Sequence, residues 1–507
     1  MSLVFGSSLG NKRKEWITNW KPRNDVDTMI IQPISLFINH EFILFSKSDN
    51  IRSINNLLDG FKEAHRKIVA GSHKKFNIGP LNKKYQEIKV ADLDSYIRTE
   101  LNYHHGTDIL GKAIILMAQD FVGSNNINLF EPDGQFGTRL ENGRDASSTR
   151  YINTYPSAIF PYIFMEDDQD LLKYKTDEGK TIEPETYLPI IPIILVNGTK
   201  GIGTGYSTHI PCHNPSDIVT WLQSRLKGEV DLPSIKPWYR GFTGQIVIID
   251  RRKLNQYKNL DINEDVNLAK EEVDGVDNNI KPLFSIVMTG IYCIRNDTII
   301  ITELPIGLSP DQYLDTIKDF LENKKIKGYK NESTADKIYF ELTGFQGNVS
   351  YETLGIRRRI SLSNMVLLDK NCIPQRYDTA NDIMETFYTE RLPYYHQRKE
   401  VKLTKIKNKL TQLNFKIQFI NAIINQELII NNVSKQSIID KMIMLKIPVE
   451  IYTEAKLSHL NKEEVAQLKK EVDIQQKEYT KLDKISPAQL WLNDLNQFYT
   501  KYKELYK

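Results

Sequence analysis

Two runs of heptad-spaced apolar residues near the end of the chain constrain its fold most. The first run alternates spacings of three and four through Leu403, Ile406, Leu410, Leu413, Ile417, Ile420 and Ile424. The second run comprises Val465, Leu468, Val472, Gln475, Tyr479 and Leu482. This periodicity predicts two long helices, which can fold back into an antiparallel coiled coil with a small tip at 426–460. Two ordinary bundle helices would show the same periodicity.

The rest of the chain predicts an α+β multidomain protein. Its 507 residues exceed the ~250–300 at which a single hydrophobic core stops growing. Between 215 and 369, β-branched runs such as 245–249 and 298–302 alternate with turn residues, which predicts a mixed α/β domain.

Positive and negative charges are balanced over the whole chain but not within individual segments. Lys and Arg total 67 against 64 acidic residues, and so the net charge of +3 says little about a polyanionic partner. Segment 61–90, however, has eight basic and two acidic residues. Such clustering is typical of a surface that binds a phosphate backbone, although a solvated helix face looks the same.

Cysteine usage and hydropathy exclude several classes of protein. Cys212, Cys293 and Cys372 are isolated, which argues against a disulfide framework or a zinc site. The longest strongly apolar stretch, 188–196, is far shorter than the ~20 residues that span a bilayer. We therefore expect an intracellular protein with no membrane partner.

The segment 143–151 offers a candidate for chemistry, since Arg150 directly precedes Tyr151. A phenol with a pKa near ~10 needs a positive field to act as a nucleophile. An arginine also stabilises the charge that develops on an attacked phosphodiester. A surface tyrosine packed beside an arginine would give the same pattern.

Two other motifs are weaker. The glycines of 198–205 lack the lysine and hydroxyl residue of a P-loop, and so we interpret them as sites of close backbone approach. The acidic run 166–170 has no second carboxylate motif beside it, which makes a magnesium site there a poor hypothesis.

A set of short motifs together resembles one family, in the family's order. They are Gly60–Lys67, Tyr103–Gly106, Ala118–Asn126, Gly134–Arg139, Arg150–Tyr151, Leu195–Gly198, Gly201–Gly205 and Pro237–Phe242. They resemble the DNA breakage and rejoining region of the eukaryotic-type topoisomerases II, which are type IIA DNA topoisomerases, and most closely the form found in large DNA viruses. The resemblance covers nearly the whole chain and is densest up to Asn214.

The resemblance implies a domain organisation. It places a winged-helix DNA-binding domain with the catalytic tyrosine at 30–215 and an α/β tower domain at 216–365. A long antiparallel coiled coil with a small helical dimer gate would follow at 366–507. Residues 1–29 would be a linker from a metal-binding domain outside this chain.

The resemblance also implies residue roles. Tyr151 would form a transient 5′-phosphotyrosine, Arg150 would stabilise the transition state, and Ile202 would wedge between base pairs and bend the duplex. The residues expected to hold DNA near the scissile phosphate are Arg66, His104, His105, Lys74 and Lys75, with Lys62, Lys67 and Tyr103 on the backbone. Glu63, Ala64 and His65 depart from the family's Pro-Gly-Gln, which puts the local loop geometry in doubt.

Cofactors and partners follow from the same resemblance. The full-length enzyme would use Mg²⁺ and ATP, both bound outside this chain, with no metal ligand and no bound cofactor in the chain alone. Double-stranded DNA and a second copy, as a homodimer, would be the partners, in the nucleus of a cell or the host cytoplasm for a virus. Two alternatives are a tyrosine recombinase, which leaves a 3′-phosphotyrosine, and a non-enzymatic coiled-coil protein that organises DNA.

Overall fold

The computed structural model describes residues 2–6, 9–21, 33–79, 81, 83–104, 106–250, 284–455 and 460–506. The chain divides into two compact units. The first unit comprises 1–166, 172–391 and 494–507, and the second comprises 167–171 and 392–493. All described strands belong to the first unit. The α+β class predicted from the sequence is confirmed, whereas the bounds of the four predicted segments remain predictions.

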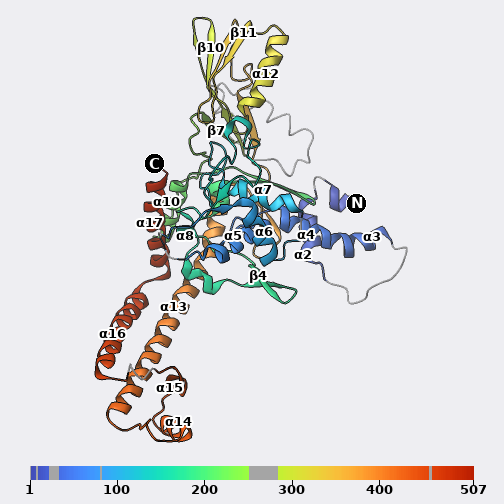
Figure 1. Cartoon of the computed structure of the whole chain (residues 1–507). Helices are drawn as coiled ribbons and strands as arrows, with labels where there is room; N and C mark the ends of the chain where they lie inside the picture. Colours follow the sequence, from blue (N-terminus) through green and yellow to red (C-terminus); the bar gives the residue numbers. More distant parts are fainter. Residues whose placement is uncertain are drawn as a thin grey trace. The chain divides into compact units, whose positions relative to one another are not determined.

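Short helices are the main regular elements in the first half of the chain (Figure 1). They are α1 (Ser2–Phe5), α2 (Gly10–Thr18), α3 (Ile34–Phe37), the π-helical η1 (Ile38–Phe42), α4 (Ile43–Ser53), α5 (Glu63–Phe76), α6 (Val90–Glu100), α7 (Thr107–Ala118), the 3-10 turns η2 (Arg139–Glu141) and η3 (Glu166–Leu171), α8 (Phe160–Ile163), α9 (Ile193–Asn197) and α10 (Pro215–Leu226). In α7 the apolar stripe of Leu110, Ile114 and Met117 is buried, as its helical spacing predicts.

The segment expected to be a linker carries two helices with packed side chains. Val4 of α1 and Ile17 of α2 are buried. The Arg13 guanidinium donates to the Gly6 carbonyl at 2.7 Å and lies over the Tyr206 ring at 5.6 Å. These contacts order α1 and α2 against the strand that carries Tyr206, a long-range interaction that local sequence does not reveal.

Four pairs of antiparallel strands connect these helices. They are β1 (Ile88–Lys89) with β2 (Asn153–Thr154), β3 (Tyr174–Asp177) with β4 (Lys180–Pro184), β5 (Thr199–Gly203) with β6 (Tyr206–Ile210), and β14 (Met365–Leu368) with β15 (Pro374–Tyr377). The β5–β6 pair is a tight hairpin in which Ile202 pairs with Ser207.

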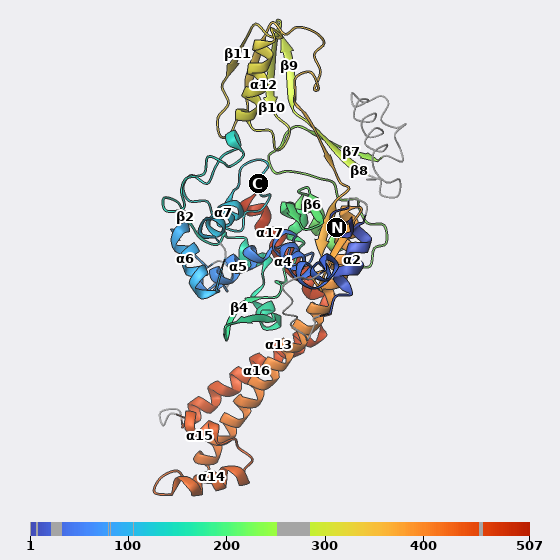
Figure 2. The ribbon, with the colours of Figure 1, turned by 90° about the vertical axis from the view of Figure 1, so that its right-hand side faces the viewer.

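Two larger sheets occupy the region between α10 and β14. The first has the order β13 (Arg357–Ser361), β8 (Phe284–Thr289), β7 (Gln245–Asp250). The second has the order β11 (Gly328–Asn331), β12 (Phe340–Thr343), β10 (Thr298–Glu303), β9 (Ile291–Arg295), and it carries α12 (Pro310–Glu322) on one face (Figure 2). Tyr313 and Ile317 of α12 pack against Ile299 and Ile301 of the sheet. The two strands predicted at 245–249 and 298–302 are thus confirmed.

The second unit is a pair of long helices that end in a helical tip (Figures 1 and 2). The long helices are α13 (Ala380–Ile424), which belongs to this unit from Leu392 onward, and α16 (Lys462–Lys484). Helices α14 (Lys435–Met444) and α15 (Glu450–Glu454) lie between them in the chain. Buried seam residues include Leu413 and Ile420 on α13 and Val465 and Leu468 on α16. Lys409 pairs with Glu471 at 3.0 Å, which fits the predicted antiparallel coiled coil.

The chain then turns back into the first unit through α17 (Pro487–Leu505). Ser486 caps this helix by accepting the Gln489 amide hydrogen at 3.1 Å. None of the described helices is both long and apolar enough to cross a membrane.

Candidate functional site

Tyr151 is the last residue of a loop, residues 134–151, that we call the tyrosine loop. The backbone on both sides of Tyr151 is held by the start of α6, because Ala91 N donates to Thr149 O at 3.1 Å and Val90 N donates to Ile152 O at 3.0 Å. Helix α7 approaches the loop at Gly111, where a Cβ would lie only 2.9 Å from Cγ2 of Thr149. The Tyr151 side chain is 71% exposed, so a reactive phenol would project from a fixed backbone.

Arg150 supplies positive charge beside this phenol. Its guanidinium carbon lies 4.8 Å from the centroid of the Tyr151 ring. A guanidinium over an aromatic face is attracted by the ring and at the same time can fork onto a phosphate. The structure therefore brings the two predicted catalytic neighbours together on an open surface.

Hydrogen bonds within the tyrosine loop stabilise its shape. The Asp145 carboxylate accepts the Thr138 amide at 2.8 Å and the Thr138 hydroxyl at 2.7 Å. Gln119, buried at the end of α7, donates to the Phe136 carbonyl at 2.8 Å. Neither Gln119 nor Asp145 was predicted to have a role, although a glutamine that ends an apolar helical stripe indicates a buried polar partner.

The β5–β6 hairpin presents Ile202 to solvent. Ile202 is 79% exposed, whereas Gly201 and Gly203 face α4. A Cβ at Gly201 would overlap the Ser53 carbonyl oxygen, and one at Gly203 would overlap the side-chain oxygen of Asn50. Because successive residues of a strand point to opposite faces, this close approach directs Ile202 away from α4. The predicted role of these glycines in close backbone approach is confirmed.

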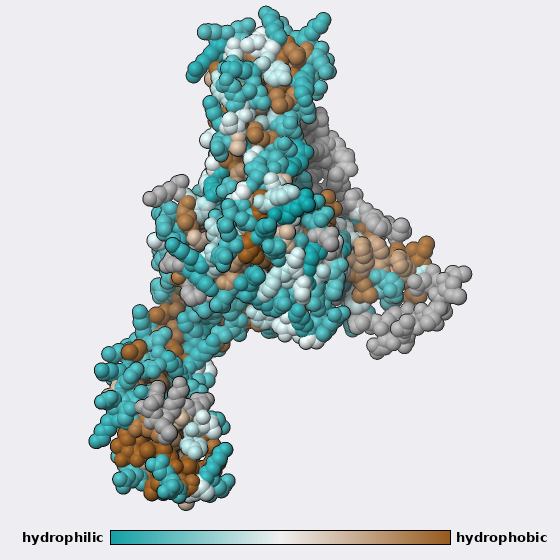
Figure 3. All heavy atoms as spheres, in the orientation of Figure 1, coloured by the Kyte–Doolittle hydropathy of each residue, from teal (hydrophilic) through white to brown (hydrophobic). Residues whose placement is uncertain are grey.

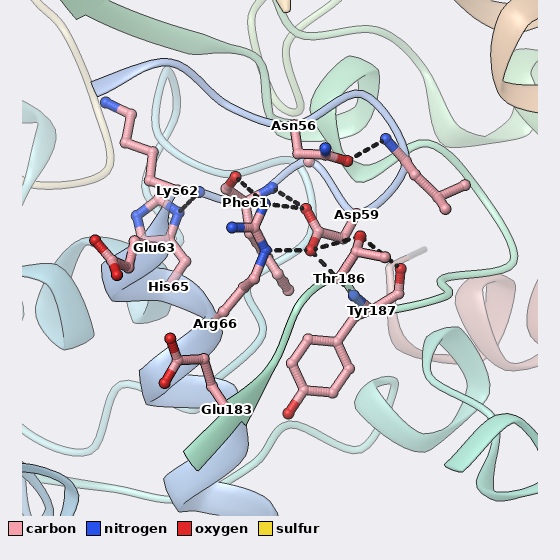
Figure 4. Close-up of polar contacts among 12 residues, drawn as sticks. Asn56, Asp59, Phe61, Lys62, Glu63, His65, Arg66, Glu183, Thr186 and Tyr187 are labelled. Carbon is pink, nitrogen blue, oxygen red and sulfur yellow. Dashed lines mark hydrogen bonds and ion pairs between the residues drawn. The ribbon is translucent and has the colours of Figure 1, made fainter. Parts of the chain in front are cut away.

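Arg66, predicted to hold the scissile phosphate, lies beneath the surface in an ion pair with Asp59 (Figure 4). Its Nε is 2.6 Å from one Asp59 oxygen and its Nη2 is 3.2 Å from the other. Asp59 is fully buried and also accepts the amide hydrogens of Phe61 at 2.9 Å and Tyr187 at 3.1 Å. Burial acts to lower the pKa of Arg66, but the charge of Asp59 and its hydrogen bonds to the guanidinium, with smaller contributions from Cys372 and Glu63, together raise the pKa. In this geometry the ion pair of Arg66 with Asp59 stabilises the start of α5.

Lys67 also forms its polar contacts with buried partners. Its ammonium donates to the Leu101 carbonyl at 2.8 Å and to Glu183 at 2.7 Å, and both charged side chains are buried. A DNA contact by Lys67 would require the release of these partners, so the position of Lys67 in this structure favours a structural role.

The other basic residues predicted on α5 reach the surface. Lys74 and Lys75 are exposed in its last turn. Lys62, just before α5, donates to the Lys200 carbonyl at 3.2 Å, which places it beside the Ile202 hairpin. Burial lowers the pKa of Lys62. The structure thus brings Lys62 and Ile202, both predicted DNA contacts, to one place.

The Tyr103–Gly106 motif is divided between interior and surface. Tyr103 is buried, with the Arg98 guanidinium 5.4 Å from its ring. His104 is exposed, and its Nε2 lies 3.3 Å from Asp177. His105 lies outside the described residues. Among the residues described, hydrogen bonds and ion pairs join none of Lys62, Arg66 or His104 to Arg150 or Tyr151.

A cationic groove next to the hairpin was missed by the sequence analysis. It has a volume of about 490 Å³ and is lined by Lys200, Ser207, His209, Arg358, Arg359, Ile360, Ser361, Ser363 and Asn364. Burial, followed by the charges of Lys200 and Arg358, lowers the pKa of His209, which indicates a positive local field. The run Arg357–Arg359 was the available signal, but its position beside the hairpin depends on contacts distant in sequence.

The acidic run that begins at Glu166 does not form a metal site. Within the second unit, Asp167 pairs with Lys402 at 2.6 Å, Asp168 pairs with Arg398 at 3.4 Å, and Asp170 pairs with Lys405. These cations recur along one face of α13 and neutralise the carboxylates. Across the described ranges, no group of three or more His, Cys, Asp or Glu side chains could hold a metal ion. The described part of the chain therefore does not fit a magnesium ion.

Comparison with known proteins places this geometry in context. The family model that describes the A subunits of DNA gyrase and topoisomerase IV matches residues 52–496. DNA topoisomerase 2 of Candida albicans is 36% identical over 87% of this chain and 28% of its own length. DNA topoisomerase 2 of Invertebrate iridescent virus 6 is 34% identical over 98% of this chain and 42% of its own length. This chain thus spans less than half of the length of each of these two relatives.

A solved structure matches over nearly the whole chain. The DNA-binding, cleavage and re-ligation domain of Plasmodium falciparum topoisomerase II superposes with a TM-score of 0.81 at 31% identity, covering 99% of this chain and 69% of that one. The long helices and both larger sheets are therefore part of a shared architecture.

Proposed function

Because the chain belongs to the DNA gyrase/topoisomerase IV family, we propose that it is the DNA-binding and cleavage core of an ATP-dependent type II DNA topoisomerase. The core makes a transient double-strand break through a 5′-phosphotyrosine so that another duplex can pass. The observation that carries this proposal is the exposed Tyr151 phenol, on a backbone fixed at both sides and with the Arg150 guanidinium over its ring.

The proposed chemistry is a reversible transesterification. The Tyr151 oxygen attacks the phosphorus, a phosphotyrosine bond forms to the 5′ end, and the 3′ oxygen leaves. Arg150 stabilises the charge that develops on the non-bridging oxygens. Attack by the 3′ hydroxyl on the phosphotyrosine reverses both changes and rejoins the strand. Mg²⁺ and ATP serve the complete enzyme and are bound outside the described residues of this chain.

DNA binding is proposed to use the exposed cations and the hairpin. Lys74 and Lys75 on α5 and the cationic groove, which includes Arg358, provide charge for phosphate contacts. Ile202 provides an apolar wedge whose insertion exchanges stacking for contact area with a bent duplex. His104 is an exposed candidate for a contact near the scissile phosphate.

Ile202→Ala should leave duplex affinity nearly unchanged and reduce both DNA bending and cleavage. Affinity is mainly electrostatic, whereas the bend requires the apolar side chain. We expect a dissociation constant within about threefold of the parent and a smaller bend angle by fluorescence energy transfer between labelled duplex ends. Val230→Ala removes another highly exposed apolar side chain, at 95% exposure, elsewhere in the chain and is the control. An unchanged bend angle in Ile202→Ala contradicts the wedge assignment.

The chain is proposed to form a homodimer partly through the tip of the coiled coil. Apolar side chains gather at the end of the coiled coil that carries α14 (Figure 3), where Ile429, Ile443 and Met444 are 60%, 63% and 77% exposed. An exposed apolar cluster of this kind marks an interaction surface.

The variant Ile443→Asp/Met444→Asp should raise the dissociation constant of the dimer by about a hundredfold or more, since each apolar side chain contributes ~1.5–3 kcal/mol when buried. Analytical ultracentrifugation over a concentration series measures this. Ile474→Asp, at a 62% exposed position of α16, is the control. Equal dimer stability in the two variants would exclude the tip as a contact.

Covalent trapping tests the proposed function. The complete enzyme is incubated with end-labelled duplex and denatured, and protein-linked DNA is then resolved on a gel. We expect linked DNA. A DNA-organising coiled-coil protein would give none, and that result would refute the proposal. The family match also argues against a tyrosine recombinase.

A further inference from the structure

The tyrosine loop has a second anchor, on the strand β10 of the four-stranded sheet. Arg139 opens the 3-10 turn η2 inside the loop, and Glu303 is the last residue of β10. One Arg139 nitrogen lies 2.5 Å from a Glu303 oxygen and 2.8 Å from the Leu304 carbonyl oxygen. Both charged side chains are buried, at 8% and 3% exposure.

The Glu303 carboxylate is held on its other side as well. Its second oxygen accepts the Thr243 hydroxyl at 2.8 Å and the Thr243 amide at 3.2 Å. The first oxygen also accepts the Leu304 amide at 2.9 Å. A carboxylate fixed by this many donors cannot follow a moving partner, and so it defines where the Arg139 guanidinium sits.

A further contact ties the loop to the same region. The Asn142 side chain donates to the Gly307 carbonyl at 3.2 Å, four residues beyond Glu303. Regular structure within the loop is limited to the three residues of η2. Its path between 134 and 151 therefore depends on turn hydrogen bonds and side-chain contacts, among which the Arg139–Glu303 ion pair is buried and joins residues 164 positions apart.

We propose that Arg139 is a positioning residue for the proposed cleavage. Its ion pair with Glu303 fixes the tyrosine loop on the end of β10, and thereby sets the place from which Tyr151 attacks. This inference rests on the proposed function. It follows from geometry because a misplacement of about 1 Å in a reacting group can slow a reaction by about a hundredfold.

The test compares Arg139→Gln, Glu303→Gln and the double variant in the complete enzyme. We expect each single variant to slow single-turnover formation of the covalent adduct by about 10- to 100-fold, with duplex affinity within about twofold of the parent. The double variant should be no slower than the slower single variant, because both remove one interaction. Arg139→Lys keeps the charge and should restore part of the rate lost in Arg139→Gln.

A control separates positioning from general destabilisation. Arg398→Gln breaks another buried ion pair, with Asp168 in the second unit. It should lower the melting temperature and leave the adduct rate at temperatures below melting unchanged. If Arg398→Gln slows the adduct as much as Arg139→Gln does, the positioning role is overturned.

The remaining outcomes also support or overturn the proposed positioning role of Arg139. A folded Arg139→Gln enzyme that forms adduct at the parental rate overturns the proposal. If Arg139→Gln does not fold, Arg139→Lys decides, since a slowed adduct with parental affinity supports the proposal and a parental rate overturns it.

If the parent itself forms no adduct, the proposed function has failed independently of this contact. Hydrogen exchange in this chain then tests the anchor directly. Amides of 140–151 should exchange at least about tenfold faster in Arg139→Gln, and unchanged exchange overturns the anchor.

Discussion

Replacing Asp59 by alanine should lower the free energy of unfolding of the first unit by about 3–5 kcal/mol. The reason is that the substitution leaves Arg66 as a buried guanidinium without its counter-charge. It also removes the acceptor used by the amides of Phe61 and Tyr187. Urea denaturation, followed through the transition that includes α5, measures the loss.

Two variants sharpen this test. Asp315→Ala breaks an exposed ion pair with Lys318 in α12, and should lower the free energy of unfolding far less than Asp59→Ala does, because solvent screens an exposed pair. Asp59→Ala/Arg66→Met removes both charges and should recover part of the stability lost in Asp59→Ala, since no buried charge is left unpaired. If Asp59→Ala and Asp315→Ala lower the free energy of unfolding by the same amount, the stabilising role of the Arg66–Asp59 ion pair is contradicted.

Tyr151→Phe in the complete enzyme should reduce the covalent adduct below detection while duplex affinity stays within about twofold of the parent. The substitution removes only the phenolic oxygen from a side chain that is 71% exposed, so folding should be unaffected. Arg150→Ala should keep the nucleophile and slow adduct formation by about 10²–10³-fold, as expected for the loss of one charge-stabilising donor.

Tyr329→Phe provides the matched control for this pair. Tyr329 is a 41% exposed tyrosine on β11, and its substitution should leave adduct formation unchanged. Quantitative trapping on denaturing gels measures all three variants. Adduct at the parental level in Tyr151→Phe would exclude Tyr151 as the nucleophile.

Features set by local periodicity and capping were predictable from the sequence. The heptad seams predicted α13 and α16 because apolar residues at this spacing form one continuous stripe along a helix, and that stripe has to be buried. Ser486 caps α17 and the proline after it is the first residue of that helix, and both residue types are local signals of a helix start. The Gly-Ile-Gly pattern indicated a close backbone contact, because only glycine tolerates the approach of α4.

Burial of charged residues was not predictable in this way. Arg66 and Lys67 stand in a basic segment, which suggested a surface. Their partners include Glu183, 116 positions away from Lys67. A charge pattern along the chain does not distinguish a cation facing solvent from one facing a distant carboxylate. The contact of Arg139 with Glu303 spans 164 positions and was hidden for the same reason.

The same limit applies to the cationic groove. Arg358 lies on β13 and Lys200 on β5, and only the folded chain brings them to one cavity. The predicted roles of Tyr151, Arg150 and Ile202 are compatible with their exposure.

Mapping the blocked DNA end decides whether Tyr151 is the nucleophile of a type II cleavage. The complete enzyme is incubated in magnesium buffer with duplexes labelled at either end of each strand, and the complexes are trapped with denaturant. The linked peptide is then identified by mass spectrometry after proteolysis. We expect protein on the 5′ end of both strands at staggered positions, attached through the peptide that contains Tyr151. Attachment at a 3′ end, or through a peptide without Tyr151, would contradict this assignment.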